Sequence, residues 1–118
     1  MATSPEQLRA RTKEFAFRVI RLYRTLPTSG EAQVIGKQLL RCSTSVGANY
    51  RAACRSRSRA EFVAKIGIVA EEADECMYWM ELLIDGGLIN AGKLEQLQNE
   101  AKELTAIFTA SRYTARGK

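Results

Sequence analysis

Four carboxylates, Glu71, Glu72, Asp74 and Glu75, are the residues whose types and close spacing could do chemistry. Oxygen ligands gathered in this way could hold a divalent cation. In a helix, Glu71 and Glu72 lie about one turn before Glu75, so the three side chains share a face. The same pattern is typical of a solvated helix face, or of a partner for arginines on a neighbouring helix. The sequence favours this second interpretation, and we expect no metal site and no cofactor.

Other residue types that carry out catalysis are missing or lack their usual helpers. The chain has no histidine, which removes the commonest general base and the commonest metal ligand. Its three cysteines show no CxxC spacing and have no histidine to activate a thiol. No glycine-rich phosphate loop is present. We therefore expect no catalytic residue and a protein that is not an enzyme.

Arginines gather near the middle of the chain. They could form a positive rim that binds phosphate without reading sequence, but clustered surface arginines also occur without any ligand. The residues alone leave both interpretations open. The candidate nucleic-acid-binding residues are Arg41, Arg51, Arg55, Arg57 and Arg59, and further positive charge follows at Arg9, Lys13, Arg18, Arg21 and Arg24.

Charge is unevenly divided along the chain, which carries a net charge of +5. Residues 1–59 hold twelve Lys and Arg against three Glu, a net +9, whereas residues 60–118 hold six against ten acidic residues, a net −4. This asymmetry can indicate attraction to phosphate. It is also expected where basic and acidic helices simply pack side by side, and the sequence favours that explanation.

These side chains would be positioned by four helices. Apolar or small residues recur at alternating spacings of four and three in four stretches, the pattern of helices packed at a shallow angle. Short connections make neighbouring helices antiparallel. The sequence predicts an all-α fold, an antiparallel up-down-up-down four-helix bundle in one domain over residues 1–118. We expect the helices at about 5–26, 30–54, 59–85 and 91–113, with capping signals at Ser4, Thr28, Ser58 and Asn90.

Two features stand out from this pattern. Asn49 falls on the apolar stripe of the second helix, where we expect a buried, hydrogen-bonded polar residue that fixes register or assembly. The third helix has more apolar surface than one bundle face needs, and aromatic residues and methionine are favoured at interfaces. The candidate oligomer interface comprises Met77, Tyr78, Trp79, Leu82 and Ile84.

Cysteine usage and hydropathy bear on location. An odd number of cysteines fits a reducing compartment. The sequence shows no secretory signal pattern and no apolar run long enough to span a membrane. We expect a cytoplasmic protein without a membrane partner.

Two long segments resemble a known bacterial family. The helix-two segment Leu40–Ala53 (LRCSTSVGANYRAA) and the helix-three segment Ser58–Leu83 (SRAEFVAKIGIVAEEADECMYWMELL) are similar to those of the four-helix bundle proteins called 23S ribosomal RNA intervening-sequence proteins. The resemblance extends over nearly the whole chain. It implies a ring of five subunits and kinship with the accessory variability protein of diversity-generating retroelements, a basic barrel that binds a reverse transcriptase and nucleic acid.

Two functions follow as hypotheses. The first is a non-enzymatic, oligomeric assembly protein that offers a basic surface to RNA or DNA with low sequence specificity. The alternative is a protein–protein scaffold or accessory subunit that binds a protein partner and never contacts nucleic acid. The expected partners are therefore copies of the chain itself and either a nucleic acid or another protein.

Overall fold

The computed structural model describes residues 3–117, and within them it contains helices and no strand. The predicted all-α four-helix fold is confirmed. Met1, Ala2 and Lys118, at the ends of the predicted domain, lie outside the described residues. The helices are α1 (Pro5–Tyr23), α2 (Gly30–Ala53), α3 (Arg59–Asp85) and α4 (Ala91–Ala115).

Polar side chains cap the start of each helix. The Ser4 hydroxyl accepts a hydrogen bond from the Gln7 backbone N–H, and the Gln7 side chain accepts one from Ser4 in return. The Ser58 hydroxyl accepts from the Glu61 N–H at 3.0 Å. For α2 the cap is Ser29 rather than the expected Thr28. These bonds satisfy N–H groups that have no partner within the helix, and so they fix where each helix begins.

Turn chemistry sets where the helices end. α1 ends at Tyr23, three residues earlier than expected, because the N–H groups of Thr25 and Leu26 bond to carbonyls three residues back in a tighter turn. Pro27 follows and disfavours helical geometry at Leu26. α3 ends before Gly87, whose φ of 71° lies in the left-handed region that glycine tolerates.

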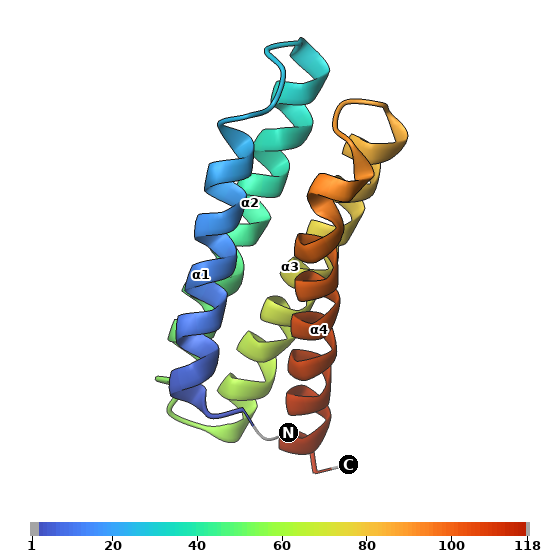
Figure 1. Cartoon of the computed structure of the whole chain (residues 1–118). Helices are drawn as coiled ribbons and strands as arrows, with labels where there is room; N and C mark the ends of the chain where they lie inside the picture. Colours follow the sequence, from blue (N-terminus) through green and yellow to red (C-terminus); the bar gives the residue numbers. More distant parts are fainter. Residues whose placement is uncertain (1–2, 118) are drawn as a thin grey trace.

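The helices form an elongated up-down bundle of 45 × 24 × 22 Å. The α1–α2 and α3–α4 connections lie at one end, and the α2–α3 connection lies at the other (Figure 1). Each helix packs closely on the next one in the chain, whereas far fewer residues of α1 and α4 contact each other. The first and last helices are therefore the least tightly joined neighbours.

The core follows the predicted stripes, with one correction on α2. The thiols of Cys42 and Cys76 meet in the core, with their sulfur atoms 3.1 Å apart. Asn49 is half-buried rather than buried, and its amide donates to the Ser45 carbonyl of its own helix at 2.9 Å. The neighbouring Tyr50 is buried instead and packs on Phe108 of α4, with ring centroids 5.1 Å apart. The buried face of α2 includes Ser43 and Tyr50 and is therefore rotated away from Asn49 relative to the predicted stripe, which leaves Asn49 at its edge.

Candidate nucleic-acid interface

A groove between α1 and α2 is lined by cations and small residues. Its volume is about 480 Å³. Arg9 and Lys13 stand on α1 and Arg51 on α2, all three exposed, and none of them forms an ion pair within residues 3–117. No carboxylate among the described residues lines the groove, whose walls are Arg9, Ala10, Thr12, Lys13 and Ala16 of α1 and Thr44, Gly47, Ala48 and Arg51 of α2. We call it the α1–α2 groove.

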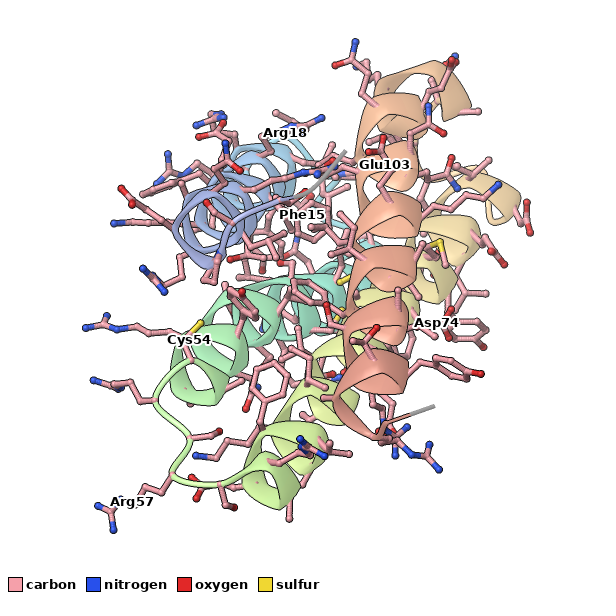
Figure 2. The ribbon with its side chains drawn as sticks, turned by 90° about the horizontal axis from the view of Figure 1, so that it is seen from below. Phe15, Arg18, Cys54, Arg57, Asp74 and Glu103 are labelled. Atoms are coloured by element: carbon pink, nitrogen blue, oxygen red, sulfur yellow. The ribbon has the colours of Figure 1, made fainter. Side chains whose placement is uncertain are left out.

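The predicted arginine rim lies beside this groove. Arg55, Arg57 and Arg59 are exposed in and just after the α2–α3 connection. Figure 2 shows Arg57 at the tip of this connection, pointing away from the bundle. Arg51 lies one turn before Arg55 and lines the α1–α2 groove as well. The rim and the groove are therefore adjacent, and together they place several cations at this end of the molecule.

Arg41, the fifth predicted member, does not belong to this rim. It lies about 15 Å along α2 from Arg51. Its guanidinium pairs with Glu72 at 3.3 Å and also with Glu75, both on α3. Burial alone would lower the pKa of Arg41, but the charges of Glu72 and Glu75 raise it. Arg41 ties α2 to α3, and a phosphate ligand would have to displace two carboxylates to reach it.

Within the carboxylate cluster on α3, Glu72 and Glu75 pair with this arginine, whereas Glu71 and Asp74 are exposed. The arrangement agrees with the interpretation that the sequence favours, a solvated face and a partner for an arginine on a neighbouring helix. Glu75 also accepts a hydrogen bond from the indole N–H of Trp79 at 2.8 Å. Across residues 3–117 no three His, Cys, Asp or Glu side chains gather where they could hold a metal ion. None of the helices in this range is both long and apolar enough to cross a bilayer.

A second groove separates α1 from α4. Its volume is about 440 Å³, and Arg18, Arg21 and Lys93 contribute its positive charge. Near the other end of α1, Arg11 joins α1 to α4 by two hydrogen bonds to Glu100, at 2.7 and 2.8 Å, and one to Glu103 at 2.8 Å. The hydrogen bonds to Glu100, more than the one to Glu103, raise the pKa of Arg11. We call this cleft the α1–α4 groove.

The candidate oligomer face on α3 is partly used by the chain itself. Met77, Trp79 and Ile84 are half-buried and pack against the core. Tyr78 stays 53% exposed, with its ring against that of Trp79 at 5.1 Å. Leu82 is half-buried. Because α3 packs on both α2 and α4, it buries more apolar surface than the sequence pattern suggested. Of the five candidate residues, only Tyr78 stays exposed.

Comparison with known proteins identifies the family. The 23S rRNA-intervening sequence protein family matches residues 7–110. The chain belongs to this family. A crystal structure of a protein of unknown function, from the S23 ribosomal protein family of Bacteroides thetaiotaomicron, superposes with a TM-score of 0.85. The two chains are 35% identical over 92% of this chain and 97% of the other. No curated protein shows significant similarity.

Membership in the 23S rRNA-intervening sequence protein family confirms the resemblance seen in the α2 and α3 segments. The sequence also indicated positive charge along α1, but it did not group those residues. Its pattern gave no sign that Arg9 and Lys13 face Arg51 across a groove, or that Lys93 of α4 joins Arg18 and Arg21. The helical period places Arg9 and Lys13 on one side of the buried face of α1 and Arg18 and Arg21 on the other. Applying this period to the α1 cations would have suggested both groups.

Proposed function

We propose that this family member is a non-enzymatic, oligomeric assembly protein of the cytoplasm that offers a basic surface to RNA or DNA with low sequence specificity. The observation that supports it most is the basic end of the bundle, where Arg9, Lys13 and Arg51 line the α1–α2 groove and no carboxylate from residues 3–117 joins them. Arg55 and Arg57 continue this surface. Cations on a groove attract phosphate backbones whatever the base sequence.

The family name and the thiols agree with this proposal. The name links the family to intervening sequences of 23S rRNA, and RNA is therefore the first ligand to test. Cys42, Cys54 and Cys76 are free thiols, as expected of a protein in a reducing compartment.

Salt dependence of RNA binding tests the proposal. We expect a labelled structured RNA to bind at 50 mM salt and to bind much more weakly at 200 mM, because bound cations release counterions. Log affinity should fall linearly with log salt concentration, and removing three phosphate contacts should make that negative slope shallower by about 3. The test variant changes Arg55, Arg57 and Arg59 to alanine.

A matched control removes the same charge elsewhere. Arg24, Lys37 and Lys102 are exposed and lie outside the rim and both grooves. Changing these three to alanine should leave most of the affinity and slope intact. If the unaltered protein fails to bind RNA and DNA at low salt, the proposal is wrong. If both triple variants lose affinity equally, net charge and not this surface accounts for binding.

The assembly part of the proposal concerns α3. Tyr78 is exposed beside Trp79, and covering such an aromatic surface is what symmetric homo-oligomers commonly do. The family resemblance supports a homopentamer. Light scattering should give a mass five times that of the chain, and Tyr78→Glu should lower it. A monomer at micromolar concentration would contradict this part.

A further inference from the structure

The outward face of α1 carries an exposed aromatic ring. Phe17 is 46% exposed. It lies two residues from Phe15 and from Val19, which are fully buried. Since each residue turns a helix by about 100°, Phe17 points away from the core. Figure 2 shows Phe15 directed into the bundle. Phe17 lies about 200° further around the helix and so occupies the opposite side of α1.

Cations flank this ring along the helix. Lys13 lies one turn before Phe17, and Arg21 lies one turn after it. A spacing of four residues advances about 40° around a helix beyond a full turn, so the line from Lys13 through Phe17 to Arg21 crosses α1 obliquely. Lys13 lines the α1–α2 groove, and Arg21 lines the α1–α4 groove. The ring therefore sits on a ridge between two basic grooves.

We infer that this ridge binds single-stranded nucleic acid, with one base stacked on Phe17 and phosphates held in the two flanking grooves. This inference rests on the proposed function. It specifies single-stranded nucleic acid as the ligand and adds the ridge at Phe17 as a contact site besides the arginine rim. Proteins that bind single strands combine a cationic track with aromatic side chains on which bases stack. Here Arg9 and Arg51 supply the track on one side of the ridge, and Arg18 and Lys93 supply it on the other.

The geometry favours a single strand over a duplex. Paired bases are stacked inside a duplex, so Phe17 could stack only on an unpaired base. The ridge is convex, and a flexible strand can pass over it into both grooves, whereas a stiff duplex cannot bend so sharply. The distance along α1 from Arg9 to Arg21 is about 18 Å, which a strand of a few nucleotides can span.

One carboxylate on the ridge competes with phosphate. Glu14 pairs with Arg21 at 3.1 Å, and both side chains are about 60% exposed. Exposed ion pairs of this kind are weak and are screened by salt. A phosphate can therefore replace Glu14 as the partner of Arg21 without disturbing the fold.

Fluorescence anisotropy with a labelled oligouridine and with an RNA duplex of the same length tests the inference on the full chain. The unaltered protein should bind the single strand more tightly at 50 mM salt. Phe17→Ala should weaken single-strand binding by about 5- to 150-fold, the range for losing one stacked base. Phe17→Trp should keep the affinity. Tyr113→Ala is the control, because Tyr113 is another exposed aromatic residue, on α4.

Each result decides the matter. Suppose Phe17→Ala binds oligouridine normally while the variant of Arg55, Arg57 and Arg59 loses RNA affinity. The inference that the ridge binds nucleic acid is then wrong, and the proposed function stands. A preference for duplex also overturns the ridge. If Phe17→Ala lowers the oligomer mass together with the affinity, Phe17 belongs to a subunit interface and the inference fails. If the unaltered protein binds no nucleic acid, the proposed function and the ridge fail together.

Discussion

The α2–α3 contact and the α1–α4 contact join neighbouring helices of one bundle by different means. Between α2 and α3, close packing buries the thiols of Cys42 and Cys76, and the ion pairs of Arg41 lie at the edge. Between α1 and α4 few residues are in contact, and the contact includes Arg11 with two carboxylates and a basic groove. The first contact depends on apolar burial, whereas the second depends more on charge and so should respond to salt.

The largest expected effect comes from the α2–α3 contact. Leu39 is buried on α2, one turn before Cys42. Leu39→Ala should lower the free energy of unfolding by about 2–5 kcal/mol, because it removes apolar contacts and leaves a cavity. Chemical denaturation measures this loss, which should be nearly the same at low and high salt. A loss below 1 kcal/mol would show that this contact is loosely packed.

A smaller, salt-dependent loss is expected at the α1–α4 contact. Arg11→Ala removes three charge-assisted hydrogen bonds and should cost about 1–2 kcal/mol. The cost should shrink at 1 M salt, where exposed charges are screened. Arg21→Ala is the control, since its pair with Glu14 lies within α1 and should change stability by under about 0.5 kcal/mol. If Arg11→Ala and Arg21→Ala lowered the free energy of unfolding equally, Arg11 would contribute no more to the α1–α4 contact than an exposed ion pair within one helix.

The smallest effect appears only at high pH and concerns Tyr50, which links α2 to α4 through the core. Burial raises the pKa of the Tyr50 phenol above its ordinary value of about 10. Above that pH the unfolded chain releases a proton that the folded chain keeps, so stability falls as pH rises. The stability that Tyr50 contributes is thus fully present below about pH 10.

Tyr50→Phe should flatten this fall. Unfolding curves at pH 8, 10 and 11 give the free energy of unfolding of each protein. The difference between the unaltered protein and the variant should change from pH 8 to pH 11. The hydrogen bond to Cys42 and burial also raise the pKa of the Cys76 thiol, so some decline should remain in the variant. Parallel pH profiles for the two proteins would contradict the assignment to Tyr50.

The sequence predicted what depends on local pattern. Ser4, Ser58 and Asn90 mark helix starts because capping is a contact within a few residues. On α4, Leu94, Leu97, Ala101, Leu104 and Phe108 recur at the alternating spacings of three and four that predict a packed helix face, and all five are buried. When a helix packs mainly through one face, a single stripe of apolar residues predicts well which of its residues are buried.

Contacts between distant residues were beyond this pattern. Arg11 and Glu100 are 89 residues apart, and no spacing rule connects them. Arg41 was assigned to the rim because it is near Arg51 in sequence, but its position on α2 turns it toward Glu72. Asn49 was expected to be buried for a related reason, since which edge of α2 is covered depends on where the neighbouring helices lie. It is Tyr50 that packs on Phe108 of α4.

The order of helix contacts has a consequence for how fast the chain folds. α1 packs on α2, α2 on α3 and α3 on α4, each through a short connection. Contacts between segments close in sequence need little loop closure, and helical bundles of this kind refold in microseconds to milliseconds. The contact between α1 and α4 must bring together the two ends of the chain. It should therefore form after the rate-limiting step, and Arg11→Ala should speed unfolding while leaving the refolding rate almost unchanged.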